Sequence, residues 1–477
     1  MEKIIGRQKQ IAQLESAIAS DKPEMVAVVG RRRIGKTFLI GNVYEKQLVF
    51  ELTGVQFATQ KEQLHLFWVQ LAKYFPLYTA PNKPESWLDA FYLLSQAIEK
   101  ANFKEKKVVF FDELPWLGTR RSDFLKGLSW FWNSWATKQR IVVVICGSAA
   151  SWMIGKVIND RGGLHNRVTK LVYLYPFTLA ETETFLLSRQ IKLNRYQIVQ
   201  IYMTMGGIPM YLDQLKAGFS AVQNIQNVCF EPDGYLRHEF DRLLTSLFDN
   251  TENYTAIVRA LAQKKMGLTR IQLIEATKFT NGGMLTEILK ELSQSGFIGI
   301  YNSHGKKSRE SLYRLTDAYS LFYLTFLEPL GENTHVDFTR LSELPKWKAW
   351  SGYAYENICL YHIDQIRESL SIKGMYSTAS SFFALPKDGY AGTQIDLIID
   401  RNDNSMNICE IKFSESDYNL TKKDVENINL KKQIFRYHSG TKKHLFTTLI
   451  TTFSVVENAN KLNHIDQVVT MEGLFKF

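Results

Sequence analysis

The chain has 477 residues, of which 45% are hydrophobic and 13% aromatic, so it can bury several cores. At roughly 100–200 residues per domain, three or four domains are expected. No apolar run approaches the roughly 18 residues of a membrane-spanning helix, and the N-terminus lacks the apolar core of a signal peptide. We therefore expect a cytoplasmic protein with no membrane partner.

The net charge and the cysteines indicate which partners and which metal sites the protein can have. The net charge is +10, which is compatible with a polyanionic partner such as DNA or RNA. The four cysteines lie far apart and form no CxxC pair, which argues against a disulfide framework and against a zinc site. Any metal is therefore expected to have oxygen ligands.

The first strong pattern in the chain is VGRRRIGKTFLI, residues 29–40. A short apolar run precedes it and a helical composition follows, which predicts a buried strand, a glycine loop and a helix. In such a loop backbone N–H groups bind phosphates, Lys36 reaches the β and γ oxygens, and Thr37 offers its hydroxyl to Mg²⁺. Gly30 and Gly35 allow conformations and close approaches that a side chain would hinder. The pattern predicts a nucleoside triphosphate site.

Two further apolar runs end in polar residues. Residues 107–113 read KVVFFDE, a Walker B pattern that directs Asp112 toward Mg²⁺ and places Glu113 to polarise an attacking water. Residues 141–148 end at Ser148, where a polar side chain at a strand tip can contact the γ-phosphate or the water. Three buried strands ending in these groups, in this order, predict a nucleotide site.

A glycine-rich basic segment, NDRGGLHNRVTK, follows the third strand. Arg161 and Arg167 in it are candidate arginine fingers, because such a segment can present a guanidinium to a γ-phosphate in the same chain or in a neighbouring subunit. A solvated basic loop is the equally weighted alternative.

These motifs resemble the P-loop ATPases of the AAA+ and STAND groups, and particularly the family of archaeal and bacterial ATPases whose loop reads GRRR[IV]GKT. IIGRQKQIAQLESAI, residues 4–18, resembles the adenine-side box of that family. LYPFTLAE, residues 174–181, resembles its junction between strand and lid, and GGIPMYL, residues 206–212, its GxP signature beside the nucleotide.

The resemblance implies ATP and Mg²⁺ as cofactors. The residues expected around the nucleotide are Gly6, Arg7, Gly30, Arg33, Ile34, Gly35, Lys36, Thr37, Phe38, Asp112 and Pro209. Arg31, Arg32 and Arg33 lie in the variable part of the loop, where backbone groups bind phosphate. We expect these three side chains to contact acidic groups of another domain.

After a mostly helical stretch, residues 254–324 show three helix signals and then two strand-like runs around a basic hairpin. This is the order of a winged helix, in which Lys306, Lys307 and Arg309 of the wing would contact phosphate. The third helix carries Glu287 and Glu291 on its outward side, which repel DNA. A structural or protein-contact role is therefore favoured over direct reading of DNA.

A new pattern begins near residue 344 and contains GTQIDLIIDRNDNSMNICEIKFS. Residues 401–405 have turn composition and the runs on either side alternate, which predicts an antiparallel hairpin with one core face. In that register Asp396 lies opposite Glu410, and Gln394 lies opposite Lys412.

Two facing carboxylates repel unless a cation lies between them, and a divalent metal would remove the conflict. The D…ExK spacing resembles the PD-(D/E)XK nuclease superfamily. The resemblance implies that Asp396 and Glu410 bind Mg²⁺, that Lys412 assists the nucleophile, and that Glu356 on the preceding helix adds an acidic residue. The alternative is a surface hairpin in which Lys412 pairs with Glu410.

Residues 421–444 hold seven Lys or Arg against two acids, including Lys431, Lys432, Arg436, Lys442 and Lys443. A nuclease needs such a surface to hold a phosphodiester backbone, although a merely solvated face is equally compatible with the pattern.

The fold expected is α/β: a P-loop NTPase parallel sheet with a helical lid, followed by a winged helix and an α/β PD-(D/E)XK nuclease-like domain. The expected bounds are 1–178 for the ATPase core, 179–250 for the lid, 251–330 for the winged helix and 340–477 for the nuclease-like domain.

The function expected is ATP binding and hydrolysis that controls a Mg²⁺-dependent DNA nuclease-like domain. The alternative is a nucleotide-controlled regulatory switch or scaffold with an inactive nuclease fold. The expected partners are ATP, DNA and, through the ATPase domain, another copy of the chain.

Overall fold

A computed structural model describes residues 3–78, 82–158, 163–248, 250–264, 266–301, 304, 311–331, 336–384, 386 and 392–477. The chain divides into two compact units, Met1–Tyr175 and Pro176–Phe477. The finer division of the second unit into lid, winged helix and nuclease-like domain remains a prediction. Among the described residues, no helix combines the length and the apolar character needed to cross a membrane.

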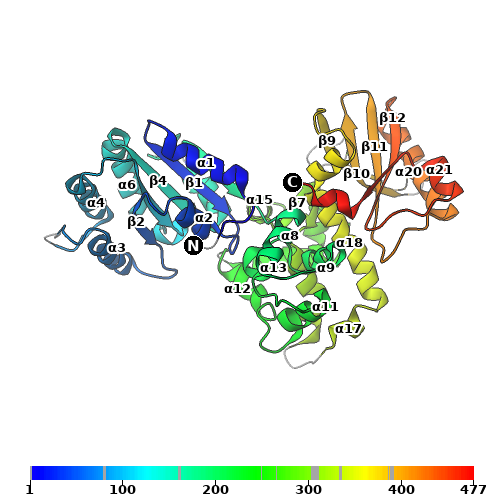
Figure 1. Cartoon of the computed structure of the whole chain (residues 1–477), viewed down its shortest axis with the longest axis horizontal. Coiled ribbons are helices and arrows are strands. Elements are labelled where there is room, and N and C mark those ends of the chain that lie inside the picture. Colours follow the sequence, from blue (N-terminus) through cyan, green and yellow to red (C-terminus); the bar gives the residue numbers. More distant parts are fainter. Residues whose placement is uncertain are drawn as a thin grey trace. The chain divides into compact units, whose positions relative to one another are not determined.

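The first unit is a five-stranded parallel sheet in the order β2-β3-β4-β1-β5, with helices on both faces (Figure 1). Its strands are β1 Glu24–Gly30, β2 Leu48–Thr53, β3 Lys107–Asp112, β4 Ile141–Gly147 and β5 Lys170–Leu174. Its helices are α1 Gln8–Ala19, α2 Lys36–Val43, α3 Gln60–Tyr74, α4 Trp87–Ala101, α5 Leu114–Leu117, α6 Phe124–Trp130 and α7 Ala150–Met153. The predicted α/β sheet of the ATPase core is confirmed.

Strand β1 is covered by helices on both faces of the sheet, which explains why its sequence is an unbroken apolar run. Val26 and Val28 pack with α1 and α2 on one face of the sheet, and Met25, Ala27 and Val29 pack with α3, α4 and α6 on the other. All seven residues of the strand are buried. Each buried valine or methionine contributes roughly 1.5–3 kcal/mol, so the central strand holds both layers together.

The second unit begins with the helices of the predicted lid. They are α8 Leu179–Ser188, α9 Arg195–Met205, α10 Pro209–Leu212, α11 Ala221–Ile225 and α12 Glu239–Thr245. Thr178 begins α8 with a capping box, in which its hydroxyl accepts from the N–H of Glu181 while the Glu181 carboxylate accepts from the N–H of Thr178.

The predicted winged-helix segment follows with the three expected helices and the two expected strands, and a short strand that was not predicted lies between its first two helices. Its helices are α13 Thr251–Gln263, α14 Arg270–Thr277 and α15 Gly283–Gln294, and its antiparallel sheet, in the order β6-β8-β7, consists of β6 Leu268–Thr269, β7 Ile298–Tyr301 and β8 Leu312–Leu315. Lys306, Lys307 and Arg309 lie outside the described residues. Glu287 is exposed as predicted, but Glu291 is half-buried and accepts a hydrogen bond from the Tyr254 hydroxyl.

Residues 318–477, which we call the C-terminal segment, contain a mixed five-stranded sheet in the order β13-β12-β11-β10-β9. Its strands are β9 Ser377–Ala384, β10 Thr393–Arg401, β11 Ser405–Lys412, β12 His444–Thr451 and β13 Gln467–Thr470. The helices of this part of the chain are α16 Ala318–Phe322, α17 Phe338–Leu341, α18 Pro345–Tyr361, α19 Ile363–Ser369, α20 Lys422–Ser439 and α21 Ala459–His464.

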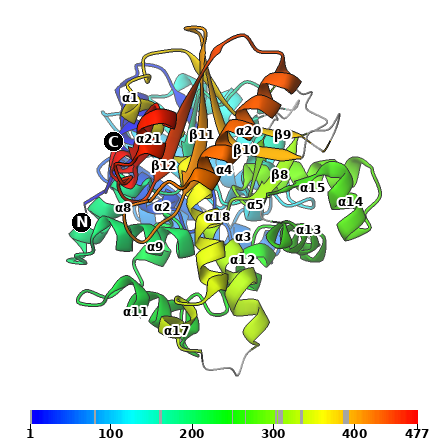
Figure 2. The ribbon, with the colours of Figure 1, turned by 90° about the vertical axis from the view of Figure 1, so that its right-hand side faces the viewer.

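The predicted single core face of the β10–β11 hairpin is wrong. Ile398 and Ile408, on the opposite side from the predicted core residues, are also buried, because Ile434 and Phe435 of α20 cover them (Figure 2). The pairing of β10 with β9 also shifts between Ile395 and Ile398, so strict alternation fails there.

One buried histidine joins the predicted lid to the C-terminal segment. The His362 ring accepts the N–H of Leu179 on one nitrogen, at 2.9 Å, and lies 2.8 Å from the carbonyl oxygen of Ile358 on the other. This arrangement requires the neutral imidazole, with the proton on the nitrogen that faces the carbonyl. Burial lowers the pKa of His362 from 6.5 to about 4.

The unfolding of the second unit should therefore depend on this histidine at mildly acidic pH. The unfolded chain binds a proton at His362 below about pH 6.5 and the folded chain does not until about pH 4, so the stabilisation is complete above pH 6.5 and is lost as the pH falls. Its size is on the order of 3 kcal/mol. Urea unfolding at pH 7.5 and 5 should show a smaller pH effect in His362→Gln than in the wild type.

The matched control for this experiment is His65→Gln, because His65 is exposed on the first unit. That variant should keep the pH dependence of the wild type. Equal pH dependence in the wild type and His362→Gln would contradict the assignment.

Candidate functional site

The loop between β1 and α2 has the backbone that a phosphate-binding loop requires. Gly35 and Arg33 adopt left-handed conformations, with φ values of 88° and 70°. A Cβ on Gly30 would lie 2.6 Å from the carbonyl oxygen of Leu174, so only glycine fits there. The turn presents successive N–H groups at the beginning of α2, which is an anion-binding arrangement.

Lys36 lies folded over this loop. Its ammonium donates to the carbonyl oxygens of Gly30 and Arg31 at 3.0 and 3.2 Å, and the side chain is buried. Both acceptors are backbone oxygens of the loop itself. The charge of Lys36 is thus held where the phosphates of a nucleotide would lie.

Thr37 and Asp112 meet at the carboxyl edge of the sheet. The Thr37 hydroxyl, at the beginning of α2, donates to Oδ2 of Asp112 at 2.5 Å. These groups meet although β4 separates β3, which ends at Asp112, from β1, which leads into the loop before α2. Oδ1 of Asp112 accepts the N–H of Glu113 at 2.8 Å. The two predicted Mg²⁺ ligands are therefore neighbours, one hydroxyl and one carboxylate, which are groups that Mg²⁺ prefers.

Glu113 is held by Ser148. Its carboxylate accepts from the Ser148 hydroxyl at 2.7 Å and from the Ser148 N–H at 3.2 Å. Glu113 has a φ of 47°, a left-handed conformation that costs a non-glycine residue about 1–2 kcal/mol. The tip of β4 thus fixes the carboxylate that was predicted to act on water.

Arg7 has a structural role within the first unit. It is buried, and its guanidinium donates to the carbonyl oxygens of Ile34 and Tyr175. It therefore joins the phosphate-binding loop to the last residue of this unit. Gly6 before it also has a left-handed φ, 62°.

The other predicted nucleotide-site residues differ in exposure. Arg31 is buried, Arg32 and Arg33 are half-buried, and Phe38 is exposed on α2. Their proposed contact with another domain remains a prediction. Pro209 begins α10 in the second unit, where Gly207 packs against the backbone of Phe177.

Of the two candidate arginine fingers, one lies among the described residues. Arg167 is exposed. Arg161 lies outside the described residues.

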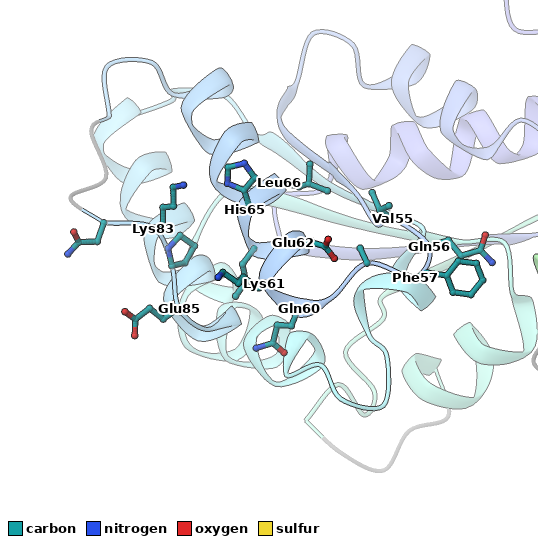
Figure 3. Close-up of a pocket in the computed structure, with 14 residues that line it drawn as sticks. Val55, Gln56, Phe57, Gln60, Lys61, Glu62, His65, Leu66, Lys83 and Glu85 are labelled. Atoms are coloured by element: carbon teal, nitrogen blue, oxygen red, sulfur yellow. The ribbon is translucent and has the colours of Figure 1, made fainter.

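The first unit also carries a surface pocket of about 1340 Å³ that sequence reasoning missed. Figure 3 shows its lining, which comes from the connection after β2, from α3, and from residues 82–85. Phe57 on its rim is 94% exposed and has a φ of 64°. None of the lining residues belongs to the phosphate-binding loop, so the pocket is separate from the nucleotide site.

Residues 4–215 match the family described as an ATPase domain predominantly from Archaea. The match supports a P-loop ATPase domain with ATP binding. An uncharacterized protein of Methanocaldococcus jannaschii is 24% identical over 431 residues, which is 89% of this chain and 90% of the relative.

Two solved structures are similar at low identity. A Walker-type ATPase of Pyrococcus abyssi is 16% identical, with a TM-score of 0.46 over 67% of this chain and 96% of that chain. The ORC2 protein of Aeropyrum pernix, solved as ADPNP–ADP complexes, is 17% identical, with a TM-score of 0.43 over 68% of this chain and 93% of that chain.

A second group of polar residues lies in the C-terminal segment, away from the ATPase domain in sequence. The β10–β11 hairpin has the predicted register, with Leu397 opposite Cys409 and Ile399 opposite Asn407. Asp396 and Glu410 are therefore the residues next to the Leu397–Cys409 pair. We call Asp396, Glu410 and Glu356 the carboxylate cluster.

Glu410 is buried between two lysines. Its Oε1 lies 2.9 Å from Nζ of Lys412, and its Oε2 lies 2.7 Å from Nζ of Lys431 on α20. The pairing of Lys412 with Glu410 was an alternative expected from the sequence, although on the surface of the protein. Burial alone would raise the pKa of Glu410, but the charges of Lys431 and Lys412 hold it below its ordinary value.

Glu356 is paired as well. Its Oε2 accepts from the guanidinium of Arg314, on β8, at 2.7 Å. Arg314 was not predicted, and Lys431 was predicted to face a phosphodiester backbone and not Glu410, because nothing in the spacing of the D…ExK motif points to either cation.

Asp396 interacts electrostatically with members of both pairs. Burial, together with repulsion from Glu356 and Glu410, raises the pKa of Asp396 to about 7, and Lys431 and Arg314 act in the opposite direction. A proton on Asp396 thus relieves part of the repulsion.

The carboxylate cluster in this arrangement does not fit a divalent cation. Both oxygens of Glu410 and one oxygen of Glu356 are bonded to protein cations. Within the described part of the chain, no three Asp, Glu, His or Cys side chains gather closely enough to hold a metal ion. The metal binding predicted for Asp396, Glu410 and Glu356 therefore has no support in this arrangement.

The predicted basic surface of residues 421–444 is partly wrong, because three of its lysines have protein partners. Lys431 bonds Glu410, Lys432 donates to the Thr447 hydroxyl at 2.8 Å, and Lys443 bonds Asp400 at 2.6 Å. These three contacts leave less free positive charge for a phosphodiester backbone than the sequence suggests.

Glu410→Gln should destabilise the second unit, because it leaves Lys412 and Lys431 close together without their shared anion. Breaking such a buried arrangement costs about 3–5 kcal/mol. The measurement is the free energy of unfolding in urea at pH 7.

Glu457→Gln is the matched control, because the side chain of Glu457 is 67% exposed and its pair with Lys461 lies at the surface. Its effect should stay within about 0.5 kcal/mol. Equal effects of the two substitutions would show that the two lysines do not depend on Glu410.

Proposed function

We propose that the chain binds and hydrolyses ATP in its first unit and uses the nucleotide state to control the C-terminal segment. The observation that supports hydrolysis is the convergence of Lys36, the Thr37–Asp112 pair and the Glu113–Ser148 pair at one edge of the sheet. These are the groups that bind phosphate, hold a hard cation and position water.

The residues of the loop and strand tips divide the work of hydrolysis. Lys36 exchanges the loop carbonyls for phosphate oxygens, and Thr37 with Asp112 would hold Mg²⁺. When bound, Mg²⁺ neutralises charge on the phosphates. Glu113 orients the attacking water and accepts its proton, while Ser148 keeps the carboxylate in place.

Arg167 is the candidate that would complete the site of another copy of the chain. It is exposed, and an arginine supplied by a neighbour stabilises the charge that develops during phosphoryl transfer. Arg161 is proposed for the same role on sequence alone. Self-association through the ATPase domain is thus part of the proposal.

Arg7 supports the control of the second unit by the nucleotide. Its guanidinium binds the carbonyl of Ile34, in the phosphate-binding loop, and the carbonyl of Tyr175, the last residue before the second unit. A change in the conformation of the loop on nucleotide binding would therefore move Arg7 and, through its hydrogen bond, the backbone at Tyr175, where the first unit ends.

Two outcomes of this control are proposed for the C-terminal segment. In one, it is a Mg²⁺-dependent DNA nuclease, supported by the placement of Asp396 and Glu410 on paired strands and by Lys412. In the other, it is a regulatory switch with an inactive nuclease fold. The closed ion pairs of the carboxylate cluster favour the second outcome for the arrangement described.

Glu113→Gln should bind ATP but hydrolyse it about 10²–10⁴-fold more slowly, because an amide cannot accept the proton of water. Lys36→Ala should lose ATP binding. The measurements are ATP binding by calorimetry and phosphate release over time.

The control for both substitutions is Glu105→Gln, because the side chain of Glu105 is 80% exposed. It should hydrolyse ATP at the wild-type rate. A wild-type rate in Glu113→Gln would overturn the role given to Glu113.

Plasmid and single-stranded DNA should remain intact when the wild-type protein is incubated with Mg²⁺ but without ATP, because the carboxylate cluster is engaged by protein cations. With ATP added, cleavage that is lost in Lys412→Ala and Glu410→Ala and deregulated in Lys36→Ala would establish the nuclease. No cleavage of either DNA, with ATP hydrolysis intact, would establish the switch.

A further inference from the structure

The connection between β2 and α3 lies against the backbone at the end of β3. Residues 54–58 of this connection form neither helix nor strand (Figure 3). Its first residue, Gly54, donates its N–H to the carbonyl oxygen of Asp112 at 3.0 Å. A Cβ on Gly54 would lie 2.7 Å from the carbonyl oxygen of Glu113. Only a glycine therefore allows the connection to approach the main chain of Glu113 so closely.

One buried side chain joins this connection to the helix that follows Glu113. The amide of Gln63, on α3, accepts the N–H of Val55 at 3.3 Å. It also donates to the carbonyl oxygens of Val55 at 2.8 Å and of Trp116 at 3.3 Å. Gln63 is only 2% exposed, so water does not replace these partners. A single amide thus binds the backbone of two segments that are far apart in the sequence.

Gln63 is itself held on a rigid element. Helix α3 begins with a capping box formed by Thr59 and Glu62, and its residues Phe67 and Leu71 are buried in the core of the first unit. The amide is therefore fixed relative to the sheet. Its removal would leave buried backbone groups of both segments without partners, which is costly.

Trp116 connects the Gln63 amide to Glu113. Trp116 lies in α5, and its N–H donates to the carbonyl oxygen of Glu113 at 2.9 Å. Glu113 has a φ of 47°, a conformation that a non-glycine residue keeps only where its surroundings enforce it. Ser148 holds the carboxylate of Glu113, whereas Gln63 holds the turn that carries it.

We propose that Gln63 is a positioning residue for Glu113. It fixes the turn after β3 to residues 54–58 and so keeps Glu113 in the left-handed conformation from which its carboxylate reaches Ser148 and the attacking water. A displacement of about 1 Å near a reacting group can cost about 10²-fold in rate. The inference rests on the proposed function, in which Glu113 accepts the proton of water, and adds the residue that holds Glu113 in place.

The test measures kcat for ATP hydrolysis, ATP binding by calorimetry and thermal unfolding of the full chain. The variants are Gln63→Met, Glu113→Gln and the double variant. Gln63→Met keeps the length of the side chain and removes its hydrogen bonds, so it should lower kcat by on the order of 10- to 10²-fold while ATP affinity is unchanged. The double variant should be as slow as Glu113→Gln alone, because Gln63 acts through Glu113.

Lys106→Met is the matched control, because Lys106 is also a buried side chain that binds backbone in the first unit. Its ammonium donates to three carbonyl oxygens, those of Ala17, Ser20 and Lys22. These residues precede β1 and Lys106 precedes β3, so the contacts lie at the amino edge of the sheet, opposite the nucleotide site. Lys106→Met should lower the unfolding temperature and keep the wild-type kcat.

A wild-type kcat in folded Gln63→Met would overturn the inference, as would an equally low kcat in Lys106→Met. A double variant slower than Glu113→Gln by the full factor of Gln63→Met would also overturn it, because that is the pattern of a general structural defect. A wild-type rate in Glu113→Gln refutes the proposed function itself. A slow Glu113→Gln beside a fast Gln63→Met refutes only the role of Gln63.

If circular dichroism shows that Gln63→Met does not fold, Gln63→Asn decides. Its amide is one methylene shorter and cannot contact Val55 and Trp116 together. A lowered kcat with unchanged ATP affinity supports the inference, and a wild-type kcat refutes it.

Discussion

The hydrogen bond between Thr37 and Asp112 depends on the order of the strands, and the rest of the first unit depends on the same order. Because β4 lies between β1 and β3, the carboxyl ends of three strands meet at one edge. The phosphate-binding loop, Asp112 and Ser148 are then brought together although they lie far apart in the sequence. A parallel sheet buried on both faces is rigid enough to hold these groups within hydrogen-bond distance.

In the first unit the ends of parallel strands bring the polar groups together, whereas in the second unit ion pairs between distant elements do so. Glu410 with its two lysines, and Glu356 with Arg314, are ion pairs whose partners come from different elements. Such pairs add little net stability compared with apolar packing, but each is costly to break on one side only. They therefore specify one arrangement of β8, α18, β11 and α20 more strongly than they stabilise it.

The features that were predicted correctly from the sequence are each encoded by a pattern within a short stretch of the chain. The glycine loop, the apolar strands ending in Asp112 and Ser148, and the register of the β10–β11 hairpin all follow from spacing within a few residues. The missed parts have partners far along the chain. Arg314 and Lys431 carry no periodic mark that distinguishes them from solvated cations, and residues 421–444 appeared to be a basic surface although Lys431, Lys432 and Lys443 all contact protein groups.

The single core face was mispredicted for a related reason. Alternation in β10 and β11 indicates one covered face, but α20 covers the other face too, and a helix that arrives later in the chain cannot be inferred from the hairpin itself. The open pocket near Phe57 likewise depends on how α3 and residues 82–85 come together, and no motif marks it.

The link from Leu179 to His362 bears on how the chain folds during synthesis. The two residues are separated by 183 positions, and the ion pair between Arg195 and Glu472 spans 277. The helices after Tyr175 therefore leave the ribosome long before the residues that complete their packing, whereas every strand of the first sheet is already available. Domains fold as units in the order of their synthesis, so the first unit can fold early while α8 and α9 wait with apolar surface exposed. We therefore expect the apolar faces of α8 and α9 to stay uncovered until the residues that pack with these helices, among them His362 and Glu472, have been synthesised.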